Sequence, residues 1–172
     1  MPEQSPEVIE RFILWLYTGQ LSRGNEEPKD LNREQFADLY IAGDIYGIPE
    51  LQNSVMDCFV AWAKTSKCRK LLSILHHVYE NTPKDCSLQR FLVERAATKF
   101  DFSRPWFEIY QALYPQQFLM GLVQELFRHK KGNPDSIDWN NPGCRYHVHH
   151  GDVVKPAEGH SDTSCEQGEE KL

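Results

Sequence analysis

The sequence lacks any long apolar segment. Its longest uninterrupted apolar run, FILWLY at residues 12–17, has six residues, whereas a helix that spans a bilayer needs about 20. The N-terminal stretch MPEQSPEVIERF is acidic and has neither a basic region nor an apolar stretch, so the sequence predicts no signal peptide. We therefore expect no membrane partner.

Positive charge is also scarce. The 172 residues carry a formal net charge of −6, and the segment from Glu34 to Ala63 contains no Lys, Arg or His. Gly43, Gly47 and Ile48 are spaced like the turn of a DNA-binding helix-turn-helix. However, the acidic residues of this segment would be repelled by phosphates, which dominate affinity for nucleic acids. The sequence therefore predicts a structural pair of helices and no nucleic-acid partner.

Cysteines are few and irregularly spaced. There are five, at positions 58, 68, 86, 144 and 165. An odd number without regular spacing favours free thiols in a reducing compartment over a framework of disulfides. We expect a cytoplasmic or nuclear protein.

The alternating pattern of a β-strand is found nowhere in the chain. Apolar residues instead recur every three or four positions, which predicts an all-α helical array. Ser87 is predicted to be the N-cap of the fifth helix. The predicted helices cover approximately residues 5–18, 32–46, 49–62, 67–80, 87–96, 106–113 and 118–127.

Capping residues mark several of these helices. Ser5 is a predicted N-cap, and Pro6 stands at the first helical position, where its missing N–H costs nothing. Gly19 follows the first helix as a stop. Asn32 and Gln35 have the spacing of a capping box. These signals support the helix boundaries independently of the apolar pattern.

The composition changes after the last predicted helix. Residues 130–150 are rich in turn formers, and residues 151–172 contain no aromatic residue. Such a segment buries too little apolar surface to offset the entropy lost on ordering, so we expect residues 130–172 to be a polar, largely disordered tail. The chain divides into residues 1–66, a helical extension at residues 67–129, and this tail.

No catalytic constellation is evident. The sequence has no Gly-rich phosphate loop and no signature of paired catalytic carboxylates. Cys58 lies on the apolar side of its helix and is expected to pack as a small hydrophobic residue. Cys86 lies close to Lys84, which could lower its pKa. His76 and His77 are adjacent and point about 100° apart on a helix, so both cannot serve one site. We predict neither enzymatic activity nor a cofactor.

A His-rich stretch, CRYHVHH, offers potential zinc ligands in Cys144, His147, His149 and His150. A structural zinc site needs four ligands, usually as two pairs at defined spacing, and a second pair is missing. We therefore predict a polar segment on the surface and no metal site, with metal binding as the alternative.

Two segments together carry a family resemblance. SPEVIERFILWLYTGQL and, after a polar loop, FADLYIAGDIYGIPELQNSVMDCF resemble the second half of a BTB/POZ domain. The stretch VYENTPKDCSLQRFLVERAATKF is similar to the helical extension that follows this domain in fungal BTB proteins. The resemblance covers about residues 3–128, and its matching residues in the domain itself are Phe12, Leu16, Tyr17, Thr18, Gly19, Leu39, Ala42, Asp44, Tyr46, Ile48, Pro49 and Leu51.

The first half of the BTB/POZ domain has no counterpart in this sequence. In the family that half supplies strands, much of the dimer interface and part of the surface that binds a cullin. The resemblance therefore implies a BTB/POZ-like region without its N-terminal half, in which the first helix lacks part of its usual cover.

We hypothesise a non-enzymatic protein-interaction module that acts through apolar helix faces. The predicted interface is the apolar set that the missing half would cover: Val8, Phe12, Trp15 and Leu16. The partner is a protein of unknown identity, and self-association or a cullin are the candidates. The resemblance also leaves two alternatives open, a substrate adaptor of a cullin-based ubiquitin ligase and a transcription-associated regulator.

Overall fold

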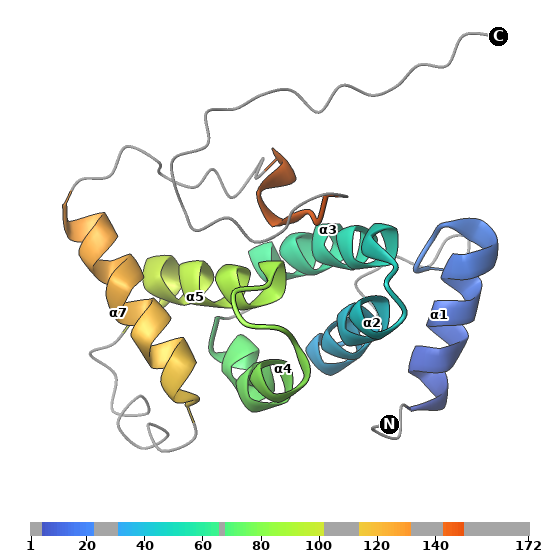
Figure 1. Cartoon of the computed structure of the whole chain (residues 1–172), viewed down its shortest axis with the longest axis horizontal. Coiled ribbons are helices and arrows are strands. Elements are labelled where there is room, and N and C mark those ends of the chain that lie inside the picture. Colours follow the sequence, from blue (N-terminus) through green and yellow to red (C-terminus); the bar gives the residue numbers. More distant parts are fainter. Residues whose placement is uncertain (1–4, 23–30, 66–67, 102–113, 132–142, 150–172) are drawn as a thin grey trace, which may run out of the picture.

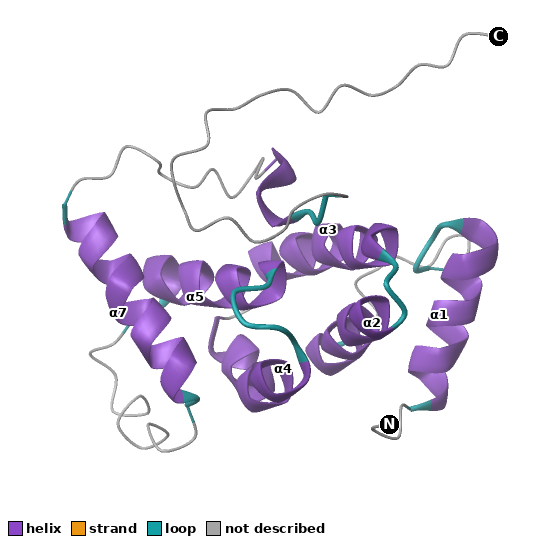
Figure 2. Cartoon of the chain, in the orientation of Figure 1, coloured by secondary structure: helices purple, strands orange, loops and turns teal. Residues whose placement is uncertain are grey.

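The structure, a computed structural model, describes residues 5–22, 31–65, 68–101, 114–131 and 143–149. These residues form helices and loops and contain no β-strand, which confirms the predicted all-α class (Figure 2). The α-helices are α1 (Pro6–Thr18), α2 (Arg33–Ile45), α3 (Pro49–Thr65), α4 (Leu75–Asn81), α5 (Ser87–Lys99) and α7 (Gln116–Lys130), and the 3-10 helices are η2 (Cys68–Ile74) and η4 (Gly143–Tyr146).

The predicted capping residues set most of the helix ends. Asn32 accepts a hydrogen bond from the N–H of Gln35 at 2.9 Å, and the Gln35 side chain accepts one from the N–H of Asn32 at 3.0 Å, which completes the capping box. Gly19 ends α1 with a φ of 68°, a left-handed conformation that favours glycine. Ser5 occupies the N-cap position of α1 without a side-chain hydrogen bond.

Two predicted helix starts differ from the structure, and one predicted helix cannot be compared with it. Ser87 is the first residue of α5 and Cys86 is its N-cap, so the predicted role of Ser87 as the cap is wrong by one position. The helix predicted at 67–80 begins as η2 and becomes α-helical only at Leu75. The helix predicted at 106–113 lies outside the described residues.

The break between α2 and α3 joins two closely packed helices. Gly47 takes a φ of 63° and reverses the chain, and the N–H of Ile48 donates to the carbonyl of Gly43 at 2.8 Å. Gly43 allows the close approach: a Cβ there would lie 2.7 Å from Cγ of Gln52 and 3.3 Å from the backbone N of Gln52. A side chain at this position would therefore push the two helices apart.

The core is organised by a row of aromatic rings. Phe36 of α2 stacks on Phe59 of α3 with ring centroids 5.2 Å apart, and Phe59 lies 5.4 Å from Phe91 of α5. The ring of Tyr146 in η4 packs edge-on against Phe91 at 5.3 Å. All four side chains are buried. One continuous core therefore crosses the predicted division at residue 66 and reaches the segment near the C-terminus.

The helices α1 and α7 lie at opposite ends of the array (Figure 1). α1 packs on α2, while α7 packs on α5 and α4. Phe118 of α7 is buried against Tyr79 of α4 and Tyr114. Among the described residues, α1 and α7 each pack on one side of the array, and each carries exposed apolar residues such as Ile13 and Phe127. No described helix combines the length and apolar character needed to cross a bilayer.

Substitution of Gly43 tests the close approach of α2 and α3. Ala is ordinarily favoured over Gly in a helix by about 1 kcal/mol, but the crowding against Gln52 costs about 1–3 kcal/mol in a packed core. We expect Gly43→Ala to lower the free energy of unfolding, measured by urea denaturation. Gly121→Ala is the control, because the added Cβ meets Val93 at 3.2 Å and touches no backbone. A Gly43→Ala variant more stable than the wild type would contradict this packing.

An ion pair connects α2 and α4. Nε2 of His77 lies 2.6 Å from Oδ1 of Asp38, and Nδ1 of His77 lies 3.4 Å from the side-chain amide of Asn81. The hydrogen bond to Asp38 raises the pKa of His77, against the opposing effect of burial, and the negative charge of Glu80 adds to the increase. The folded state therefore stabilises the protonated form of His77 relative to the unfolded chain.

This pair makes stability depend on pH. Because the pKa of His77 is raised in the folded state, its contribution is fully present below the unfolded pKa of about 6.5 and is lost as the pH rises through the folded pKa. We expect the free energy of unfolding to fall less steeply with rising pH in His77→Gln than in the wild type. Urea denaturation between about pH 5.5 and 8.5 measures both slopes. The matched control is His76→Gln, at an exposed neighbour. Equal slopes in His77→Gln and the wild type would disprove the linkage.

Candidate functional site

The four predicted interface residues lie on two different sides of α1. Val8 is 0% exposed and belongs to the core, so its predicted exposure is wrong. Phe12 and Trp15 are half-buried, and Phe12 stacks on Tyr46 with ring centroids 5.3 Å apart. Leu16 is 53% exposed. Val8 and Trp15 lie on the inner face of α1, the face through which the helix packs on the core.

An exposed apolar stripe runs beside this inner face. Ile9, Ile13 and Leu16 follow the i, i+4, i+7 spacing of one helix side, and each is exposed. Phe12 lies between the stripe and the core, and the exposed Tyr46 extends the surface to the end of α2. We call this surface, formed by Ile9, Phe12, Ile13, Leu16 and Tyr46, the α1 face.

Ile9, Ile13 and Tyr46 are exposed but were not among the predicted interface residues. The signal was present, because apolar residues cover a wider arc of this helix than a single packing face requires. What the pattern could not reveal was which part of the arc is turned inward. That choice depends on the contacts of α1 with α2 and with the buried Leu21.

A second apolar stripe lies at the other end of the array (Figure 1). Met120, Val123 and Phe127 of α7 are exposed at i, i+3, i+7 spacing. The last turn of this helix is basic, with Arg128, His129 and Lys130. The last turn of α1, in contrast, contains no basic residue.

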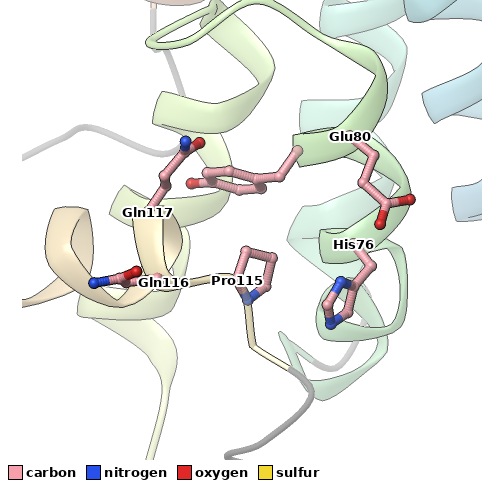
Figure 3. A pocket seen from close by; sticks show the side chains of 6 residues that line it. His76, Glu80, Pro115, Gln116 and Gln117 are labelled. Atoms are coloured by element: carbon pink, nitrogen blue, oxygen red, sulfur yellow. The ribbon is translucent and has the colours of Figure 1, made fainter.

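The residues weighed for catalysis do not form a reactive centre. Burial raises the pKa of the Cys58 thiol to about 11, which disfavours the nucleophilic thiolate. Cys58 and Cys86 are free thiols. A hollow of about 260 Å³ lies between α4 and the start of α7, where Figure 3 shows His76 and Glu80 facing Gln116 and Gln117. Its lining contains no Ser, Thr or Cys that His76 could activate.

Residues 143–149, which we call the strap, pack on α3 and α5. The prediction of a disordered tail from residue 130 is therefore wrong for the strap and for Lys130, the last residue of α7, and residues 132–142 and 150–172 lie outside the described part of the chain. Tyr146 is 2% exposed. Cys144 is disulfide-bonded, which corrects the prediction of free thiols at that position.

The strap contains His147 and His149, two of the potential zinc ligands. Nε2 of His147 lies 2.8 Å from Oδ1 of Asp57 on α3, while His149 is exposed. The described residues contain no group of three or more His, Cys, Asp or Glu side chains placed to hold a metal ion, and His150 lies outside them. Of the four residues that could have served as zinc ligands, His147 pairs with a carboxylate and Cys144 is in a disulfide.

A buried carboxylate holds the strap in place. Glu94 of α5 accepts two hydrogen bonds from the Arg145 guanidinium, at 2.8 and 3.0 Å, and a third from the hydroxyl of Tyr146 at 2.6 Å. The hydrogen bonds to Glu94 raise the pKa of Arg145, and burial beside the same carboxylate raises the pKa of Tyr146. Both side chains therefore stay protonated and donate to Glu94 at physiological pH.

Comparison with known proteins provides no relative: no family model, no curated protein and no solved structure matches this chain.

The carboxylate of Glu94 can be tested by an isosteric change. Glu94→Gln keeps the shape but loses the charge-assisted bonds to Arg145 and Tyr146, and we expect the free energy of unfolding to fall by about 2 kcal/mol. The control is Glu34→Gln, since the exposed Arg33–Glu34 pair is expected to contribute less than about 1 kcal/mol. Urea denaturation measures both. Equal effects of the two changes would mean that Glu94 does not hold the strap.

Proposed function

We propose that this chain is a non-enzymatic protein-interaction module, related to BTB/POZ proteins, that binds its partner through the α1 face. The observation that carries the proposal is the exposed stripe of Ile9, Ile13 and Leu16, which continues through Phe12 to Tyr46. Contiguous exposed apolar surface is typical of protein-binding sites, and aromatic residues are enriched in their cores.

The shape of the α1 face narrows the kind of partner. The stripe spans about 10 Å along the helix axis at 1.5 Å per residue, which suits a partner helix laid alongside it. A complementary partner would carry apolar residues at helical spacing.

The BTB/POZ relationship is part of this proposal. Its support is the helix that ends at Tyr17, Thr18 and Gly19, followed by the α2–α3 pair with the break at Ile48 and Pro49. Within the resemblance, α1 is a helix whose outer side is covered by another part of the family's fold. The α1 face is therefore where a partner would supply comparable cover.

The narrower alternatives stay predictions. Neither adaptor function for a cullin-based ubiquitin ligase nor a transcription-associated role is favoured by any particular contact among the described residues. The proposed location is the cytoplasm or the nucleus; the free thiols of Cys58 and Cys86 support it, and the disulfide at Cys144 counts against it.

A charge in the middle of the α1 face tests the proposal. Ile13 is exposed, so Ile13→Glu should leave the fold intact while placing a carboxylate in the apolar contact. We expect this change to weaken association by roughly 30-fold or more, as for a central interface residue. Light scattering reports self-association, and affinity capture from an extract of the source organism reports other partners.

Phe127→Glu on α7 is the matched control, since Phe127 is 61% exposed at the opposite end of the array. Associations of the wild type should be lost in Ile13→Glu and kept in Phe127→Glu. The proposal fails if the wild type neither self-associates nor captures a protein, or if Ile13→Glu retains every association. Circular dichroism confirms that both variants keep their helices.

A further inference from the structure

The strap is held on α3 and α5 in the manner of a bound peptide. Only one of its side chains, Tyr146, is fully buried, and the others are half-buried or exposed. Apart from the disulfide of Cys144, its other anchors are hydrogen bonds and ion pairs to side chains of the two helices. One deep aromatic anchor, an adjacent Arg and a polar surround are also the features that dominate protein–peptide affinity.

Asn53 of α3 forms hydrogen bonds with the backbone of the strap. Its side-chain amide donates to the carbonyl of Val148 at 3.0 Å and accepts from the N–H of the same residue at 2.6 Å. This two-way contact satisfies both backbone groups of one residue, as a neighbouring β-strand would. It contacts only the backbone of Val148, so it does not depend on the side chain that this residue carries.

Glu94 of α5 accepts hydrogen bonds from two successive side chains of the strap. It receives the guanidinium of Arg145 and the hydroxyl of Tyr146 at once, while Phe91 packs against the tyrosine ring. Glu94 is only 8% exposed, so a ligand that failed to supply both donors would leave a buried carboxylate short of partners. Lys in place of Arg, or Phe in place of Tyr, would be discriminated against.

Two further contacts complete the surface. Asp57 of α3 pairs with His147, and the side chain of Arg90 donates to the carbonyl of Arg145 at 3.2 Å. The side chains that the surface offers to its ligand are thus two carboxylates for cationic groups, an amide for the backbone and an aromatic wall. The residues that bind the strap are Asn53 and Asp57 of α3 and Arg90, Phe91 and Glu94 of α5.

We propose that this surface of α3 and α5 is a peptide-binding site for an Arg-Tyr-His segment of a partner protein that adopts the helical turn of η4, and that the strap occupies the site in cis. The site is distinct from the α1 face, so the inference does not depend on the proposed function. A partner segment must compete with a strap tethered to the same chain, and such tethering corresponds to an effective concentration in the millimolar range. Partner binding is therefore weak until the strap is released.

The test uses the full chain with its strap disabled. Arg145→Ala/Tyr146→Ala removes the two side chains of the strap that bind Glu94 and leaves every residue of the binding surface unchanged. The probe is a fluorescein-labelled peptide with the sequence of residues 143–149 that carries Cys144→Ser. Binding is measured by fluorescence anisotropy in the presence of a reductant, because Cys144 is disulfide-bonded.

We expect saturable binding to the double variant and at least roughly tenfold weaker binding to the wild type, whose strap competes. Binding should be lost when the peptide carries Tyr146→Phe or when the double variant also carries Asn53→Ala. Should the double variant lose its helical circular dichroism, Arg145→Ala alone replaces it: the strap then keeps Tyr146 in the core but loses its ion pair with Glu94, and the peptide should bind this variant more tightly than it binds the wild type. No saturable binding to a folded variant, or equal binding of a scrambled peptide, would overturn the proposal.

Discussion

The fold depends on the row of rings formed by Phe36, Phe59, Phe91 and Tyr146. Each ring comes from a different element, so none of α2, α3, α5 or the strap can shift without disturbing at least one aromatic contact. Buried aromatic side chains remove large apolar areas from water and prefer particular ring orientations. The row therefore fixes the relative positions of the central helices, and α1 and α7 are added outside it.

Their place at the ends explains why both of these helices expose apolar residues. A helix inside the array can bury several sides, but α1 packs on α2 and lies at the edge. Its arc of apolar residues is wider than that single contact: Val8 turns inward and Ile13 turns outward. Attachment to the fold requires only the inner part of the arc. The outer part, with Ile9, Ile13 and Leu16, is exposed, which is why we propose it as the surface for partner binding.

The local features of this fold could be predicted from the sequence, and the distant pairings could not. The capping box at Asn32 and the stop at Gly19 depend on neighbours within a few residues, and both were predicted correctly. The strap was predicted to be disordered because its order comes from Glu94, 51 residues before Arg145, and from Asn53, 95 residues before Val148. On α1 the helix was predicted, but the inward position of Val8 was not, because apolar residues on adjacent sides leave the rotation of the helix ambiguous.

The two surfaces differ in the physical basis of their selectivity. The α1 face offers apolar contact, which is not directional and accepts any partner of complementary shape. The strap surface uses Glu94 and Asn53, whose hydrogen bonds fix both the register and the chemistry of the ligand. A carboxylate as buried as Glu94 is costly to leave unpaired, so selectivity arises from the penalty for a wrong ligand more than from the gain of a correct one. An internal strap avoids that penalty in the free protein, because it keeps Glu94 paired whenever no partner is bound.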